Sequence, residues 1–166
     1  YRYGFDDIYL ANEDLSDAKD LKIKIRAFDI NSKQIFSDQL SVEIKSNTSK
    51  FIYKLPVIKG ITSVWFLELS ITDKNNNQID NSIYWLSVKK DILDYDAAKK
   101  LVWPYYTPAK QFADFTMLDK LPKVKLQFDY QFNKDEKNGK ISLKVKNPSE
   151  SLAFFIFFDV IDPVTR

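Results

Sequence analysis

Residues 21–27 read LKIKIRA, and this short stretch already indicates the fold class. Its apolar side chains alternate with the cationic side chains of Lys22, Lys24 and Arg26. A period of two places the apolar groups on one face of an extended strand and the cations on the other. The same alternation returns in residues 36–44 and 65–72. We therefore predict β-strands with one face in a core and the other in water.

Clusters of Asn, Asp and Ser separate these runs, in a chain that has only three glycines. The clusters lie at residues 12–14, 31–33, 46–49 and 73–77. These residue types favour turns because their side chains bond to nearby backbone and tolerate a left-handed conformation. About six or seven strands fit into the first 90 residues, with no long amphipathic helix between them. We predict an all-β fold that begins with an antiparallel β-sandwich over residues 1–90.

Residues 81–122 read NSIYWLSVKKDILDYDAAKKLVWPYYTPAKQFADFTMLDKLP. Residues 91–101 match one or two helical turns, with aspartates at the start and lysines at the end. Prolines at positions 104, 108 and 122 then enforce extended backbone before each of them. We predict that residues 91–122 form an irregular connection anchored by rings. Four side chains are expected to be largely buried as these anchors: Trp85, Trp103, Tyr106 and Phe115.

Strand alternation resumes after Pro122, in residues 123–132 and 141–145, with a charged hairpin loop between them. A nearly continuous apolar run follows at residues 152–160 and predicts a strand that is buried on both faces. Three strands make only part of a sandwich. Residues 123–166 are therefore predicted to be a partial second β-sandwich, and the chain reads as a piece of something longer.

Composition excludes several classes of chemistry. The chain has neither cysteine nor histidine, which removes disulfides, thiolate zinc sites and the Ser-His and Cys-His nucleophile pairs. We expect no cofactor and no metal. A net charge of +2 without a basic block argues against nucleic acid as a partner. No apolar run reaches the length of about 18 residues that suggests a membrane span, so we expect no membrane partner.

Paired carboxylates are the catalytic groups that remain possible, as in glycosidases. The candidates are Asp6, Asp7, Asp91, Asp94, Asp96, Asp135 and Glu136. Adjacent acids in a strand point to opposite faces, and acids in turns or at helix starts cap the backbone. We expect such structural roles and assign no catalytic residue. Residues 73–77 superficially resemble a calcium loop but lack the glycine and final glutamate of an EF-hand, so we expect a plain hairpin loop.

An alternative for the aromatic connection is a stacking platform for sugar rings. Trp103, Tyr105 and Tyr106 are the candidate sugar-stacking residues. The anchoring role is preferred, because irregular backbone needs large buried side chains to stay ordered.

Several short motifs resemble one known family. They occur in order as SIYWLS (82–87), DILD (91–94), YYTP (105–108), QFADF (111–115) and LDKLP (118–122). They are similar to the region after the catalytic barrel in glycoside hydrolase family 2 enzymes of the β-mannosidase and exo-β-D-glucosaminidase type.

The resemblance implies immunoglobulin-like sandwiches in a non-catalytic accessory region. The parent is then expected to hydrolyse β-glucosaminide or β-mannoside linkages, in the periplasm or outside the cell, with catalytic glutamates on a barrel that this chain lacks. The implied partners are that barrel and neighbouring domains of the same polypeptide, with an oligo- or polysaccharide as a further possibility. A carbohydrate-binding module and a generic adhesion sandwich remain open as alternatives.

Overall fold

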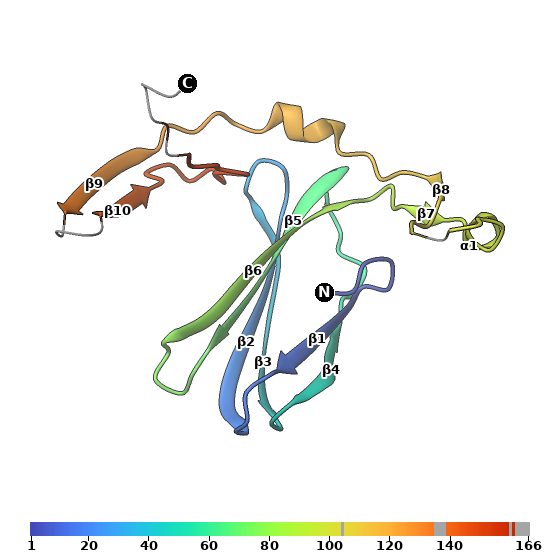
Figure 1. Cartoon of the computed structure of the whole chain (residues 1–166), viewed down its shortest axis with the longest axis horizontal. Coiled ribbons are helices and arrows are strands. Elements are labelled where there is room, and N and C mark those ends of the chain that lie inside the picture. Colours follow the sequence, from blue (N-terminus) through green and yellow to red (C-terminus); the bar gives the residue numbers. More distant parts are fainter. Residues whose placement is uncertain (104, 135–138, 160, 162–166) are drawn as a thin grey trace. The chain divides into compact units, whose positions relative to one another are not determined.

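The computed structural model describes residues 1–103, 105–134, 139–159 and 161. The chain divides into two compact units, Tyr1–Leu121 and Pro122–Arg166. Strands account for nearly all of the regular structure in both units (Figure 1).

A four-stranded antiparallel sheet forms one layer of the first unit, in the order β3-β2-β5-β6. Its strands are β2 (Ala18–Phe28), β3 (Gln34–Ile44), β5 (Val64–Thr72) and β6 (Gln78–Ser87). The LKIKIRA stretch lies in β2, at the centre of this sheet (Figure 1). Ile25 pairs there with Asp38 on one side and with Leu69 on the other.

The second layer is an antiparallel pair made by β1 (Asp7–Asn12) and β4 (Thr48–Lys54). Ile8 and Leu10 of β1 join the core that the larger sheet supplies through residues such as Ile23, Ile25 and Leu67. The predicted alternation is therefore confirmed, because the aliphatic side chains of β2 are buried and Lys24 is exposed. Two antiparallel layers around one core confirm the β-sandwich.

Short polar loops join the strands as predicted. In the β5–β6 hairpin, the Asp73 carboxylate accepts hydrogen bonds from the backbone N–H groups of Asn75 and Asn77, each at 2.8 Å. It also accepts one from the Asn77 side chain at 2.9 Å. These bonds from Asn77 and Asn75 hold the pKa of Asp73 below its usual range. The expected hairpin between β5 and β6 is confirmed, and the Asp73 carboxylate closes its turn.

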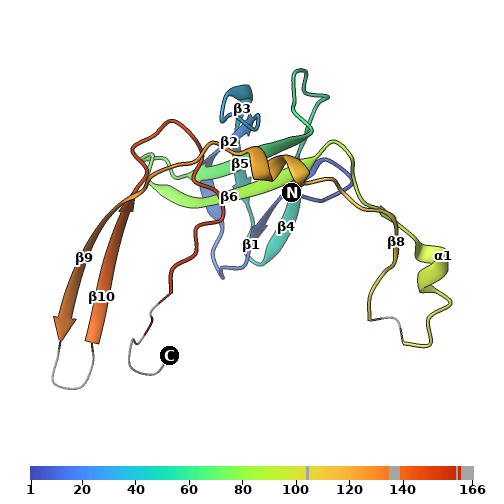
Figure 2. The same ribbon diagram turned by 90° about the horizontal axis from the view of Figure 1, so that it is seen from above.

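The connection leaves β6, carries a short helix and returns towards the sandwich (Figure 2). Its elements are β7 (Ile92–Leu93), α1 (Tyr95–Ala98), β8 (Ala109–Gln111) and the 3-10 helix η1 (Thr116–Lys120). The predicted helical segment is a single turn, and the Asp94 side chain caps its start by accepting a hydrogen bond from the backbone N–H of Ala97 at 3.0 Å. β7 and β8 pair with each other and close the loop at its base.

The second unit contains an antiparallel hairpin of β9 (Gln127–Lys134) and β10 (Gly139–Lys146). Phe128, Tyr130 and Phe132 lie opposite Val145, Leu143 and Ile141, so the apolar side chains share one face. The hairpin is where the alternation predicted it, while the expected loop lies mostly outside the described residues.

The prediction of a strand at residues 152–160 is wrong for the residues of this range that the structure describes. Residues 152–159 have no strand structure, and Val160 lies outside the described residues. Phe155 has a φ of 54°, a left-handed conformation that interrupts an extended run. Apolar composition allows a strand but does not supply the ladder of backbone hydrogen bonds that a strand needs.

Candidate functional site

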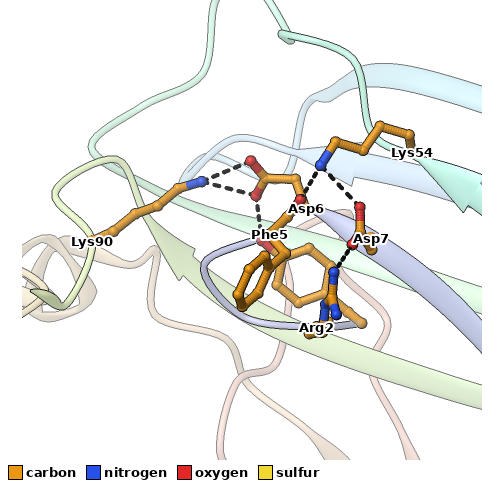
Figure 3. A network of polar contacts seen from close by, with 7 residues as sticks. Arg2, Phe5, Asp6, Asp7, Lys54 and Lys90 are labelled. Carbon is orange, nitrogen blue, oxygen red and sulfur yellow. Dashed lines mark hydrogen bonds and ion pairs between the residues drawn. The ribbon is translucent and has the colours of Figure 1, made fainter. Parts of the chain in front are cut away.

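Two adjacent acids, Asp6 just before β1 and Asp7 at its start, belong to the polar network that Figure 3 shows. Asp7 is buried, and one carboxylate oxygen accepts a hydrogen bond from Lys54 of β4 at 2.9 Å. The other oxygen accepts one from Arg2, whose guanidinium also lies over the Phe5 ring at 4.0 Å (Figure 3). The Lys54 and Arg2 bonds lower the pKa of Asp7. This carboxylate is an ion-pair partner that fastens the first segment of the chain to β4.

Asp6 points the other way and pairs with Lys90, directly before the connection (Figure 3). The Lys90 ammonium donates to both Asp6 oxygens, at 2.9 and 2.8 Å, and the Tyr1 hydroxyl donates at 2.7 Å. Burial opposes the charged form, but the bonds from Lys90 and Tyr1 outweigh it and lower the pKa of Asp6. Burial and the bond to Asp6 raise the pKa of the Tyr1 hydroxyl. Asp6 lies in the turn before β1 and not in the strand, so the prediction for adjacent acids within a strand does not apply to this pair.

The other described acids among the candidates are also engaged with backbone or cations. Asp94 caps α1 and lies 3.6 Å from Lys110, and the bond from Ala97 is the main reason for its lowered pKa. Asp96 pairs with Lys99 one turn later, at 3.3 Å. Asp91 accepts a hydrogen bond from the backbone N–H of Ala113 at 2.8 Å. The remaining two candidates, Asp135 and Glu136, lie outside the described residues.

A groove of about 480 Å³ lies next to this network, within the first unit. We call it the aromatic groove. One wall comes from the first residues of the chain, Tyr1 to Phe5, and another from Trp65 and Trp85 of the larger sheet. Residues 90–93 and Tyr95 add a third wall, and Ala113 and Phe115 of the returning connection complete the lining. The lining is mostly apolar, and Tyr3, Phe5 and Tyr95 each expose more than half of their surface.

Hydrogen bonds within the chain already engage several polar groups of the aromatic groove. Lys90 and the Tyr1 hydroxyl are bonded to Asp6 as described above. The Ser87 hydroxyl accepts from the backbone N–H of Asp114 at 3.3 Å, and Asp91 from that of Ala113. These bonds tie Ala113 and Asp114 of the returning connection to Asp91 and to Ser87 at the end of β6, and Ser87, Asp91 and Ala113 all line the groove.

The candidate sugar-stacking residues lie elsewhere, in the loop between α1 and β8. Trp103, Tyr105 and Tyr106 are 73%, 83% and 56% exposed. The rings of Tyr105 and Tyr106 contact each other with centroids 5.8 Å apart and planes tilted by 46°. The structure thus brings the two tyrosines together, and all three side chains reach solvent.

The prediction that four rings are buried anchors is wrong for Trp103 and Tyr106. Trp85 is 37% exposed, and Phe115 is half-buried. Two backbone hydrogen bonds lie in and at the base of this loop: Tyr105 N–H donates to the Trp103 carbonyl at 2.9 Å, and Asp94 N–H to the Pro108 carbonyl at 2.7 Å. Such bonds satisfy backbone polar groups without burial of the rings.

Sequence reasoning missed the first segment of the chain as part of a site. Residues 1–5, YRYGF, contain three aromatic side chains directly before the first strand, and this density was the available signal. Among the described residues, no three His, Cys, Asp or Glu side chains gather closely enough to hold a metal ion. Within the same residues, no helix combines the length and the apolar character needed to cross a membrane.

Two family models match the chain. The model described as "Mannosidase Ig/CBM-like domain" matches residues 7–91. The model described as "Exo-beta-D-glucosaminidase Ig-fold domain" matches residues 104–166.

Curated relatives carry the name exo-beta-D-glucosaminidase. The protein from Hypocrea virens is 30% identical over 127 residues, which is 76% of this chain and 14% of the relative. The protein from Hypocrea jecorina is 31% identical over 122 residues, 73% of this chain and 13% of the relative. The chain therefore spans less than a fifth of the length of these relatives.

Solved structures of one protein from Amycolatopsis orientalis have the same fold. The exo-chitosanase CsxA of Amycolatopsis orientalis superposes with a TM-score of 0.78 and 18% identity, covering 89% of this chain and 18% of that one. The complex of its E541A variant with PNP-beta-D-glucosamine gives the same TM-score.

Proposed function

Because the chain belongs to the family of mannosidase Ig/CBM-like domains through residues 7–91, we propose that it is a non-catalytic structural module of a multidomain glycoside hydrolase. Its parent acts on β-glucosaminide or β-mannoside linkages. The names of the relatives favour the β-glucosaminide linkage as the parent's substrate, since each relative is named exo-beta-D-glucosaminidase. The module's partners are the catalytic barrel and the neighbouring domains of the same polypeptide.

The observation that supports the structural role is that the carboxylates of Asp6 and Asp7 form ion pairs within the chain. A glycosidase needs one carboxyl group that donates a proton and a second that attacks or activates water. Asp6 and Asp7 instead hold Lys90, Lys54 and Arg2. Cations at both carboxylates stabilise the charged form, which is the wrong state for a general acid near neutral pH.

The domain organisation forms part of the proposal. We assign residues 1–90 to an immunoglobulin-like sandwich, residues 91–122 to the connection and residues 123–166 to part of a second immunoglobulin-like domain. A compact unit that begins at Pro122 supports the second boundary. The backbone N–H groups of Ala113 and Asp114 donate hydrogen bonds to Asp91 and Ser87, so the returning part of the connection is bound to its own start and to the end of β6.

Hydrolysis assays test the proposed function. The purified 166-residue chain should release no product from aryl β-glucosaminides or aryl β-mannosides, whereas the complete polypeptide encoded with it should hydrolyse one of them. Turnover by the pure chain that persists through repeated purification would contradict the non-catalytic role. A complete polypeptide inactive on both substrate classes would contradict the proposed parent.

The exposure of Trp103, Tyr105 and Tyr106 favours a second candidate function, carbohydrate binding. Exposed rings can stack on the apolar faces of sugar rings. Titration with chitosan or mannan oligosaccharides should then change tryptophan fluorescence in the wild-type chain and not in Trp103→Ala. Phe112→Ala removes another exposed ring of the connection and is the matched control. Unchanged fluorescence and amide shifts at millimolar sugar would exclude this function.

A further inference from the structure

The triplet Asn47-Thr48-Ser49 lies where β3 turns into β4, and it has the form Asn-X-Ser/Thr with a middle residue other than proline. This form is the acceptor signature for N-linked glycans, which are attached at protein surfaces. All three residues are exposed. Within the full sequence, this is the one triplet that satisfies the signature. The β3–β4 turn is therefore a candidate modification site.

The side-chain amide of Asn47 is available for reaction. The turn is closed by other groups, since the Asn47 backbone N–H donates to the Asp14 carbonyl at 3.1 Å. The Thr48 hydroxyl donates to the Lys45 carbonyl at 2.8 Å. Within the described residues, no hydrogen bond engages the side chain of Asn47. A sugar on its amide nitrogen therefore leaves the hydrogen bonds of the turn intact.

A second triplet of similar form, Asn147-Pro148-Ser149, shows the opposite arrangement. Proline at its middle position removes it from the acceptor signature. The Asn147 amide nitrogen donates to the Ser151 carbonyl at 2.7 Å, and its amide oxygen accepts from the backbone N–H of Ser149 at 3.1 Å. This amide is part of the turn that it closes. The contrast identifies Asn47 as the acceptor, because its amide has no such structural task.

The β3–β4 turn lies at the end of the sandwich opposite the connection. The start of β2 pairs there with the end of β3 and with the end of β5, so the turn shares its end with the β5–β6 hairpin (Figure 1). The connection leaves β6 after Ser87, which pairs with Val64 at the other end of the sheet. No residue of the turn lines the aromatic groove. A bulky, solvated glycan at Asn47 is therefore compatible with the fold of the sandwich.

We propose that Asn47 accepts an N-linked oligosaccharide when the chain is made in a secretory pathway that carries this modification. The donor is an oligosaccharide joined to a polyprenyl diphosphate. The Asn47 amide nitrogen bonds to the anomeric carbon of the first sugar, the bond from that carbon to the diphosphate oxygen breaks, and polyprenyl diphosphate leaves. One amide proton is released, and nothing is oxidised or reduced. The proposal is independent of the proposed function, because it uses only the exposed triplet of this chain.

Secretion of the 166-residue chain from a yeast host tests the proposal, with an Asn-Ala-Thr tag at the end of the chain to report that the host glycosylates it. Peptide mass spectrometry should find a glycan on Asn47 that peptide N-glycosidase removes, and none on Asn147. Ser49→Ala should abolish this glycan, whereas Ser49→Thr should keep it. Both variants retain Asn47, whose φ of 49° makes substitution of the asparagine itself a source of strain. An unmodified Asn47 in a chain whose tag is modified would overturn the proposal.

Thermal unfolding of the glycosylated fraction provides a second readout, because it separates an acceptor on the native surface from one that is modified only in misfolded chains. The glycosylated chain should show the same cooperative transition and the same circular dichroism as its deglycosylated form. A glycosylated fraction that lacks this transition, while the Ser49→Ala chain from the same host shows it, would refute a native surface acceptor. The hydrolysis assays above share no readout with this experiment, so either proposal can fail without the other.

Discussion

Asp7 is a buried carboxylate whose oxygens meet cations from two different segments, Arg2 and Lys54. Its pKa is lowered in the folded protein, so folding favours its charged form. The contribution to stability is therefore fully present above the unfolded-state pKa of about 3.9 and is lost as the pH falls through the lower folded-state value. This residue stabilises the chain near neutral pH and weakens it in acid.

We predict that Asp7→Asn destabilises the chain at pH 7 and that the difference from wild type shrinks below about pH 4, where the native carboxylate takes up a proton. Denaturant unfolding at a series of pH values measures this. Asp80→Asn removes the charge of an exposed carboxylate on β6 and serves as control. A wild-type advantage that stays constant from neutral to strongly acidic pH would contradict the role of the charge.

Asn47 has a φ of 49° in the turn between β3 and β4. Left-handed backbone costs a residue with a Cβ about 1–2 kcal/mol, and β-branching adds to the crowding. Asn47→Val should therefore lower the free energy of unfolding by at least about 1 kcal/mol, while Asn47→Gly should leave it equal or higher. Ser46→Val, at a neighbour without positive φ, controls for the added side chain. Equal stabilities of the valine and glycine variants at position 47 would refute this account.

At the scale of elements, β5 is an inner strand of the four-stranded sheet and supplies several buried side chains to the core. Leu67 is fully buried and lies between Ala27 of β2 and Tyr84 of β6. Truncation leaves a cavity that the two neighbouring strands cannot fill. We predict that Leu67→Ala costs about 2–5 kcal/mol in denaturant unfolding. Ile79→Ala, at an exposed position on β6, should change stability by less than about 0.5 kcal/mol. Similar costs for both would show that the core lies elsewhere.

Elements were predictable where the side-chain pattern is local. The alternation in β2, β5 and the β9–β10 hairpin identified real strands, because successive side chains of a strand point to opposite faces. The same reasoning failed for residues 152–159, which are apolar but do not form a strand. Their pattern lacks alternation, and a continuous apolar run does not specify its backbone conformation.

At the scale of the whole molecule, the core belongs to the first unit. All residues of the core cluster lie within Tyr1–Leu121. We predict that a chain ending at Leu121 folds with the melting temperature of the sandwich transition in the full chain, because it keeps every buried contact of that cluster. Calorimetry of the two chains measures this. A shortened chain without a cooperative transition would contradict the division into units and the proposed boundary at residue 122.

The candidate site was less predictable than the fold. The motifs in residues 82–122 identified the family, and the expectation that an acid near the helix start caps the backbone agrees with the bond from Ala97 N–H to Asp94. The exposure of Trp103 and Tyr106 and the ion pair between Asp6 and Lys90 were not foreseen. Asp6 and Lys90 are far apart in sequence, so no local pattern reports their contact.

The sequence by itself determined that the chain is a β-sandwich protein without cysteine or histidine chemistry. Strand alternation and turn composition depend on neighbouring residues only, which is why they are readable from one sequence. The tertiary structure alone decided which aromatic rings are exposed and that residues 1–5 meet the connection to form the aromatic groove. Burial and groove formation depend on which distant segments pack together, and that packing is a property of the folded chain as a whole.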